Sequence, residues 1–295
     1  MMQTDAARPP TWIEVSLNGP WGRALQPRIP IAPAEIVAEG IAAARAGASI
    51  VHFHAYDAAT GRQDDDWETY ARVIEGIRAQ VDVIAYPTIP LAGSALTAQG
   101  DLGTERFHHI DELGRRGLIE WGVVDPGSVN FAPVRGDDPG FVYLNPNDHV
   151  REGLRVCAAH RIRPAYAIYE PGFTRLGAAL AAHYPGLLTP VYRFMFSDDF
   201  AWGFPPRAYA LDAYLQLLAE TADGAAWMVA GLGVEITPLI DEAIARGGHL
   251  RVGLEDARHG TDATNAQLVE AAARRVHAAG AQVATAADVR RALAP

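Results

Sequence analysis

The chain alternates short apolar runs with longer amphipathic stretches, and this alternation limits its fold more than any other feature. The apolar runs have the length of buried strands and lie at residues 12–17, 49–54, 82–88, 119–124, 163–169, 189–196, 226–230 and 249–254. A stretch with helical periodicity follows each run, at residues 33–46, 67–80, 104–116, 147–160, 172–184, 207–222, 236–246 and 264–279. Strands that alternate with helices pair in parallel. Eight such units are the number in a closed (β/α)8 TIM barrel, so we predict this α/β fold. A doubly wound open sheet is the alternative.

The sequence predicts one catalytic domain. A length of 295 residues suits a single barrel, and no change in composition marks a boundary within residues 12–295. Residues 1–11 are polar and contain prolines, so we expect a flexible N-terminal arm there. No Gly-x-Gly-x-x-Gly turn follows the first predicted strand, which disfavours a dinucleotide-binding fold.

Charge and cysteine content exclude several classes of function. The net charge is −10 and no block of basic residues stands out, so nucleic acid and membrane are poor partners. The one cysteine, Cys157, cannot form an internal disulfide, and the N-terminus lacks the apolar core of a signal peptide. We therefore expect a cytoplasmic protein.

Two segments far apart in the chain carry chemistry at the ends of predicted strands. His52 and His54 are two residues apart and therefore share one face of a strand, as do Arg251, Gly253 and Glu255. Two imidazoles and one carboxylate are the ligand set of a catalytic zinc that keeps one position open. Manganese or iron would also accept these ligands. The structural alternative is one core histidine, one surface histidine and an acid that caps a turn.

Five further residues belong to the predicted site. Asp256 is offset by one residue from Glu255 and is a candidate general base, and Arg251 could bind a carboxylate or orient Asp256. A structural ion pair is the alternative for Arg251. Thr88 ends the third predicted strand, and Ser128 and Asn130 follow the fourth. All three could contact substrate or merely cap loops.

Several motifs together resemble the β-keto acid cleavage enzymes, over roughly residues 12–293. They are Leu17-Asn18-Gly19, the segments 29–33 and 46–54, and above all Gly247-Gly248-His249-Leu250-Arg251-Val252-Gly253-Leu254-Glu255-Asp256, followed by residues 265–269 and 283–285. The resemblance implies a (β/α)8 barrel, a homotetramer and one zinc per chain at His52, His54 and Glu255. It implies that acetyl-CoA is a co-substrate and that the products are acetoacetate and a new acyl-CoA. It also makes Arg251 and Asp256 the acid–base pair.

The chain departs from the family pattern around the substrate. Trp21 stands where the amino-substrate enzyme has a glutamate, and Thr88 stands near the position of a family serine. Trp21, Tyr86, Tyr166 and Trp202 suggest a bulkier or more apolar substrate side chain, unless Asp198 or Asp199 receives a cationic group. The loop at residues 196–200 lacks the family's glycines and could alter CoA binding.

Three other functions compete with this interpretation. A CoA-independent lyase or aldolase would use the same metal and enolate chemistry. A metal hydrolase on this barrel carries histidines on its fifth and sixth strands, and the runs 163–169 and 189–196 contain none. A non-catalytic zinc-binding barrel would need a fourth protein ligand to close its site.

Overall fold

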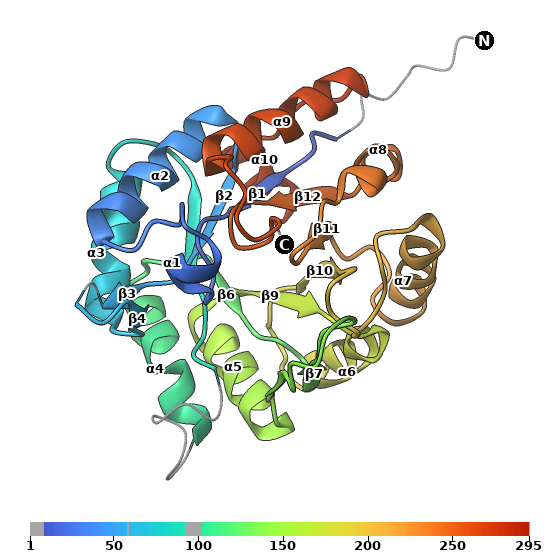
Figure 1. The fold of residues 1–295 in the computed structure, drawn as a ribbon. Coiled ribbons are helices and arrows are strands. Elements are labelled where there is room, and N and C mark those ends of the chain that lie inside the picture. The colour runs from blue at the N-terminus through green and yellow to red at the C-terminus, as the bar shows by residue number, and fades with distance from the viewer. Residues whose placement is uncertain (1–8, 58, 92–101, 295) are drawn as a thin grey trace.

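The structure, a computed structural model, describes residues 9–57, 59–91 and 102–294. Eight parallel strands form one sheet in the order β5-β2-β1-β12-β11-β10-β9-β6. The two end strands, β5 and β6, lie next to each other, although no ladder joins them within the described residues. The sheet therefore curls into a nearly closed barrel (Figure 1). The strands are β1 (Ile13–Ser16), β2 (Ile50–Phe53), β5 (Ile84–Pro87), β6 (Trp121–Val123), β9 (Arg163–Ile168), β10 (Val191–Phe196), β11 (Trp227–Gly231) and β12 (His249–Val252).

One helix follows each barrel strand, and the helices form an outer ring around the sheet (Figure 1). These helices bury their apolar faces against the strands, and α3 and α9 begin at capping side chains. In α3, for example, the side chain of Asp66 accepts a hydrogen bond from the Thr69 backbone N–H and caps the helix. The ring consists of α2 (Pro33–Ala46), α3 (Trp67–Arg78), α4 (Leu102–Arg115), α5 (Asn147–His160), α6 (Pro171–Ala181), α7 (Ala208–Thr221), α8 (Thr237–Ala245) and α9 (Asn265–Ala278).

The predicted barrel is confirmed, and the differences lie in its connections. Two antiparallel hairpins occupy segments predicted as loops, because their strands of two or three residues are too short to show a period-two pattern. Two short helices, α1 and α10, are also additional to the prediction. The extra elements are β3 (Tyr56–Asp57), β4 (Arg62–Gln63), β7 (Val129–Phe131), β8 (Phe141–Tyr143), α1 (Gly22–Leu25) and α10 (Ala286–Ala292).

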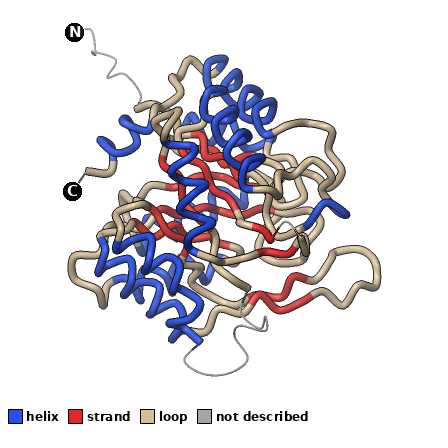
Figure 2. The backbone as a smooth tube through the Cα atoms, turned by 90° about the vertical axis from the view of Figure 1, so that its left-hand side faces the viewer, coloured by secondary structure: helices blue, strands red, loops and turns tan. Residues whose placement is uncertain are grey.

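The two ends of the barrel differ in construction. Long loops, α1 and the hairpin β7–β8 gather at one end, and α10 lies at the other (Figure 2). Most of the predicted N-terminal arm, residues 1–8, lies outside the described residues. Thr11 is buried and pairs in parallel with Val283, so this residue belongs to the barrel. None of the described helices is long and apolar enough to cross a membrane.

The barrel interior becomes polar toward the loop-rich end. Alternate residues of a barrel strand point inward, so pairs two positions apart share the interior. Four such pairs line one cavity at the ends of β2, β6, β9 and β10. They are His52 and His54, Val123 and Asp125, Ala167 and Tyr169, and Arg193 and Met195.

Candidate active site

His52, His54 and Glu255 come together at the loop-rich end of the barrel. One nitrogen or oxygen from each lies within 4.8 Å of the others. Glu255 Oε2 is 3.6 Å from His52 Nε2, and Glu255 Oε1 is 3.5 Å from His54 Nε2. These separations are too long for hydrogen bonds. Ligand atoms held ~2 Å from one tetrahedral zinc would lie roughly 3.3 Å apart, so the spacing fits a shared metal.

Unpaired buried atoms in this triad also fit a metal. His54 Nε2 and Glu255 Oε2 are buried and have no hydrogen-bond partner among the described residues. An unpaired buried polar atom is costly, and a metal ion would use both lone pairs. Burial lowers the pKa of His52 well below its ordinary value, so its imidazole is neutral and able to ligate.

Gln63, on β4, sets the orientation of His54. The Gln63 amide nitrogen donates to the Asp65 carboxylate at 2.9 Å, which leaves Gln63 Oε1 as an acceptor 2.8 Å from His54 Nδ1. His54 Nδ1 must therefore carry the proton, and the lone pair of Nε2 faces Glu255. Such partners raise the basicity of a ligating imidazole and fix its ring.

Glu255 reaches the triad from a turn, which corrects one step of the sequence argument. Strand β12 ends at Val252, and Gly253 adopts a φ of +143° at the start of the turn. A Cβ at Gly253 would lie 2.1 Å from the backbone oxygen of Ser16, so only glycine fits. Because the strand ends early, its period-two alternation does not separate Glu255 from Asp256, and both carboxylates reach Arg251.

Arg251 is the centre of a buried charge cluster. It donates two hydrogen bonds to Asp256, at 2.8 and 3.0 Å, and one to Glu14 Oε1 at 2.9 Å. Its Nη2 is 3.1 Å from Glu255 Oε1. Burial raises the pKa of Asp256 to about 6, although Arg251 favours the charged form. Burial also opposes ionisation of Glu255, but Arg251 and the two histidines hold its pKa well below the usual range.

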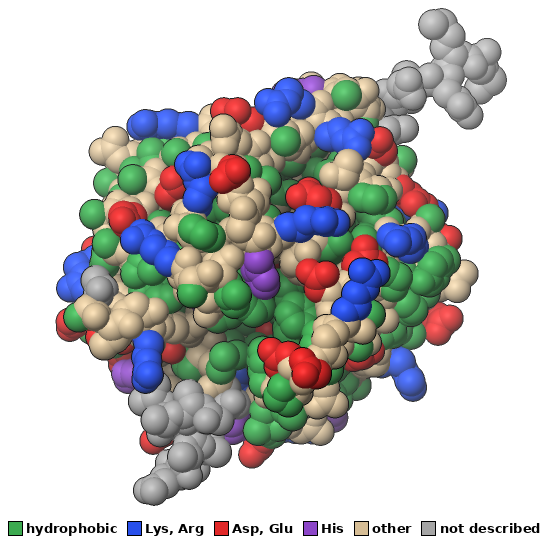
Figure 3. Space-filling view, viewed as in Figure 1, with side chains coloured by type: hydrophobic (Ala, Val, Ile, Leu, Met, Phe, Trp, Pro, Cys, Tyr) green, Lys and Arg blue, Asp and Glu red, His purple; other side chains and the backbone are tan. Residues whose placement is uncertain are grey.

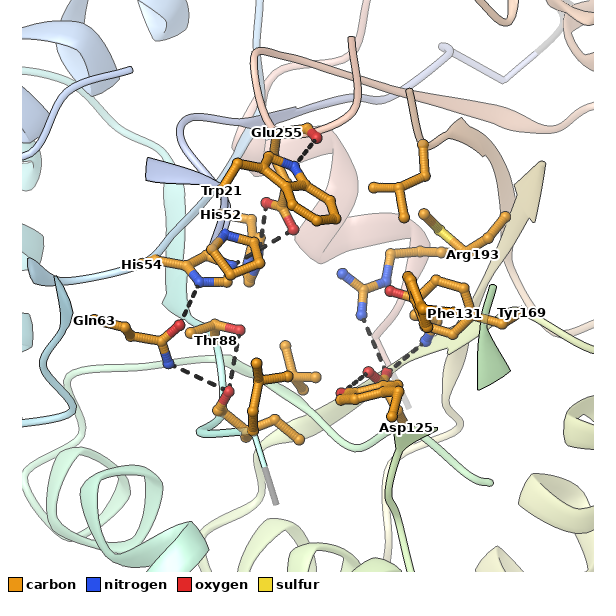
Figure 4. Close-up of a pocket in the computed structure, with 18 of the residues that line it drawn as sticks. Trp21, His52, His54, Gln63, Thr88, Asp125, Phe131, Tyr169, Arg193 and Glu255 are labelled. Carbon is orange, nitrogen blue, oxygen red and sulfur yellow. Dashed lines mark hydrogen bonds and ion pairs between the residues drawn. The ribbon is translucent and has the colours of Figure 1, made fainter. Parts of the chain in front are cut away.

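The triad opens into a cavity whose far wall is aromatic and charged (Figure 4). Its empty volume is about 640 Å³ including the open mouth. Arg251, Thr88 and Trp21 border the cavity on the side of the triad, and the Trp21 indole N–H donates to the Glu255 backbone oxygen at 2.8 Å. The aromatic residues in the lining are Trp21, Phe131, Phe141, Tyr143 and Tyr169.

Asp125 and Arg193 face the cavity opposite the triad. Asp125 accepts hydrogen bonds from the Tyr143 hydroxyl at 2.7 Å and the Ala167 backbone N–H at 2.8 Å. Arg193 Nη2 lies 3.7 Å from Asp125 Oδ1 and also donates to the backbone oxygen of Ala165. The Asp125 carboxylate is therefore already satisfied by its neighbours.

Several predicted residues lie away from the cavity. Within the described part of the chain, Ser128 and Asn130 are exposed and are not among the lining residues. The Ser128 hydroxyl accepts a hydrogen bond from the Asn145 backbone N–H, which is the loop-capping alternative. Asp256 contacts the cavity only through Arg251.

The aromatic residues singled out from the sequence are also mostly elsewhere. Of the four, only Trp21 lines the cavity, in the described residues. The Tyr86 hydroxyl donates to Glu14, and the Tyr166 hydroxyl donates to the Gly177 backbone oxygen. Trp202 is buried in the aromatic packing behind Tyr169, 5.0 Å between ring centroids.

Five residues of the site were not predicted from the sequence. Glu14 and Arg193 could have been recognised from the sequence, since each is a charged residue inside an otherwise apolar strand. Asp125 could also have been recognised, because it directly follows the fourth predicted strand. Gln63 and Tyr169 could not, because their roles depend on the hairpin β3–β4 and on the cavity's shape.

The chain is similar to known proteins over nearly its whole length. The sequence model described as beta-keto acid cleavage enzyme matches residues 10–294. The chain is 29% identical over 282 residues to the 3-dehydrocarnitine:acetyl-CoA trimethylamine transferase of Rhizobium meliloti (strain 1021), covering 90% of this chain and 89% of that enzyme. It is 29% identical over 273 residues to the 3-keto-5-aminohexanoate cleavage enzyme of Fusobacterium nucleatum subsp. nucleatum, covering 90% and 91%.

A third relative and one solved structure extend the comparison. The 3-oxoadipate:acetyl-CoA acetyltransferase of Cupriavidus necator is 28% identical over 295 residues, covering 95% of this chain and 93% of the relative. The apo structure of ObcA superimposes with a TM-score of 0.72 at 18% identity and covers 90% of this chain. The chain spans 65% of the ObcA chain, and at this identity the likeness concerns the fold alone.

Proposed function

The chain belongs to the β-keto acid cleavage enzyme family, and we propose that it is a zinc-dependent acyltransferase acting on a β-keto acid and acetyl-CoA. The acyl group R–CO moves from the β-keto acid to the CoA sulfur. The acetyl group joins the two remaining carbons and gives acetoacetate. The observation that carries this proposal is the buried His52–His54–Glu255 triad, which opens on the same cavity as Arg251. Relatives named for acetyl-CoA support the co-substrate.

His52, His54 and Glu255 would hold one divalent ion per chain, with its remaining position open to the cavity. When bound, such an ion supplies a Lewis acid beside the carbonyl oxygens of the substrate. Gln63 keeps the His54 lone pair directed at the ion's position. We propose zinc because three such ligands and an open fourth position are its usual catalytic arrangement.

Arg251 and Asp256 are the proposed acid–base pair. Arg251 presents positive charge to the cavity, and Asp256 holds its guanidinium through the two-pronged bond. The pair takes up the proton from the carbon between the keto and carboxylate groups and returns a proton later. A pKa of about 6 for Asp256 suits this task, since a group that gains and returns a proton works best near the ambient pH.

The cavity wall supports a bulky, apolar substrate side chain. Its rings include Trp21, Phe131 and Tyr169, and Thr88 adds a hydroxyl near the triad. Asp125 is already bonded to Tyr143 and the Ala167 backbone and lies near Arg193, so it offers no free charge to an ammonium group. We therefore expect apolar β-keto acids to react faster than amino-substituted ones.

A turnover experiment tests the proposal. Zinc-loaded protein is incubated with acetyl-CoA and a panel of β-keto acids, and new acyl-CoA species are measured by mass spectrometry. His52→Ala should lose both bound zinc and activity, and Asp256→Ala should lose activity while it retains zinc. His108→Ala is the matched control, because this histidine is exposed on α4; it should keep both.

Each outcome decides between functions. New acyl-CoA that disappears in both variants supports the acyltransferase. Cleavage of the β-keto acid in the absence of CoA would contradict the acyltransferase and favour the lyase or hydrolase alternative. We also propose that the protein is cytoplasmic, in keeping with its single cysteine. We further propose a homotetramer, as the family resemblance implies, and light scattering of the purified protein tests this assembly.

A further inference from the structure

A second cavity lies at the loop-rich end of the barrel, and we call it the arginine groove. Three arginines line it, each from a different loop: Arg135 between β7 and β8, Arg207 before α7, and Arg258 after β12. The groove is open, with an empty volume of about 1480 Å³ including its open side. A recess bordered by basic and acidic side chains is visible near the middle of this face (Figure 3).

The arginine groove adjoins the active-site cavity. Leu232 lines the active-site cavity, and the next residue, Gly233, lines the groove. Trp21 of the cavity packs edge-on against His259 of the groove, 5.2 Å between ring centroids. The two spaces are therefore neighbours, with the Trp21 and His259 rings between them.

The groove carries positive charge that the protein does not neutralise. Within the described residues, no ion pair or side-chain hydrogen bond joins Arg135 or Arg258 to an acid. Arg207 lies 3.7 Å from Asp198 and is half exposed. Asp198 and Asp199 also line the groove, so arginines outnumber acids there by three to two, in a chain of net charge −10.

The composition of this lining indicates the chemistry of a ligand. Guanidinium groups present paired N–H donors that match phosphate oxygens. Arginines from three loops that converge on one recess form a site for a ligand with several phosphates, and the Asp198–Arg207 pair at 3.7 Å is loose enough to open.

On the basis of the proposed function, we propose that the arginine groove binds the phosphate groups of the acyl-CoA co-substrate. The pantetheine arm then passes Trp21 and His259 to bring the thioester to the triad. The altered loop at residues 196–200 contributes Asp198 and Asp199 to this groove. In this proposal the loop therefore lies beside the phosphates of the bound CoA.

The test compares acetyl-CoA with acetyl-pantetheine, a thioester that lacks the phosphates. In the Arg135→Ala/Arg258→Ala double variant, the KM for acetyl-CoA should rise roughly tenfold or more, since charge-assisted contacts are lost. The KM for acetyl-pantetheine and the KM for the β-keto acid should not change. Arg274→Ala, an exposed arginine on α9, is the matched control.

Asp198→Asn is a second variant, and we expect it to change the KM for acetyl-CoA in the opposite direction. Removal of this negative charge should lower the KM for acetyl-CoA and leave that for acetyl-pantetheine unchanged. Thermal unfolding and the KM of the β-keto acid report whether any variant is merely misfolded.

Direct binding of CoA, measured by calorimetry, separates failure of the groove from failure of the proposed function. CoA binding that weakens in the double variant supports the groove even if no acyl-CoA forms. Turnover with an unchanged affinity for CoA in the double variant, or equal losses with both thioesters, would overturn the groove alone. A wild-type protein that binds no CoA would overturn both.

Discussion

At the scale of single residues, the site depends on side chains that hold other side chains in place. Arg251 bonds Asp256 and Glu14 and lies beside Glu255, and Gln63 orients His54. The meeting of His52, His54 and Glu255 was predictable because His-x-His and Glu-Asp stand at or just after strand ends. The role of Gln63 was not predictable, because nothing local in the sequence places this residue of β4 beside His54.

Gln63→Ala should weaken zinc binding without unfolding the protein. Loss of the acceptor frees the His54 ring to turn and to change its tautomer, and loss of such partners costs ~10–100-fold in metal affinity. Competition with a chromophoric chelator measures the effect. Gln80→Ala, at an exposed position just after α3, is the control. Wild-type zinc affinity in Gln63→Ala would show that this contact does not orient the ligand.

At the scale of elements, strand ends decide which side chains meet. The eight strands were predictable as apolar runs, because a barrel strand is buried on both faces. The helices were predictable from periodicity, because each buries one face against the strands. The end of β12 was not, because the apolar pattern runs on through Leu254 while the backbone turns at Gly253. Ser128 and Asn130 were predicted to lie at the site because they follow a strand. This prediction was wrong, because the hairpin β7–β8 carries both residues to the surface.

Gly253→Ala should disrupt the turn that carries Glu255. The new Cβ would lie 2.1 Å from the Ser16 backbone oxygen at a φ of +143°, so we expect a loss of at least about 2 kcal/mol in the free energy of unfolding, with weakened zinc binding. Gly260→Ala is the control, because its φ is +74° and its Cβ meets open space. It should cost only about 1 kcal/mol. Urea unfolding measures both, and equal losses would refute the steric argument.

The junction of β1 and β12 should make stability depend on pH. His249 is buried against Trp12, 3.7 Å between ring centroids, and its Nδ1 accepts the Trp12 backbone N–H. Burial lowers its pKa from 6.5 to about 3. Between these values only the unfolded chain binds the proton, so the stabilisation is complete above pH 6.5 and is lost progressively as the pH falls toward 3.

His249→Phe keeps a stacked ring that cannot be protonated. Between pH 7 and pH 5, wild type should lose about 2 kcal/mol more than this variant in the free energy of unfolding. Urea unfolding at the two pH values measures the difference. Equal losses in both proteins would show that His249 is not the titrating group.

At the scale of the whole molecule, the barrel brings loops from all parts of the chain to one end. The triad joins β2 to the turn after β12, and the cavity adds residues from β6, β9 and β10. The fold and the meeting of the three candidate metal ligands followed from the sequence because they depend on strand order and strand ends. The aromatic wall and the arginine groove did not, because they depend on how long loops cross the barrel mouth.

The central claim is an exchange of acyl groups between a β-keto acid and acetyl-CoA. It is tested most directly with acetyl-CoA carrying two ¹³C atoms in its acetyl group and an unlabelled β-keto acid, with both products analysed by mass spectrometry. We predict acetoacetate that contains both labelled carbons and a new acyl-CoA that contains none. Unlabelled products, or cleavage at the same rate without acetyl-CoA, would contradict it.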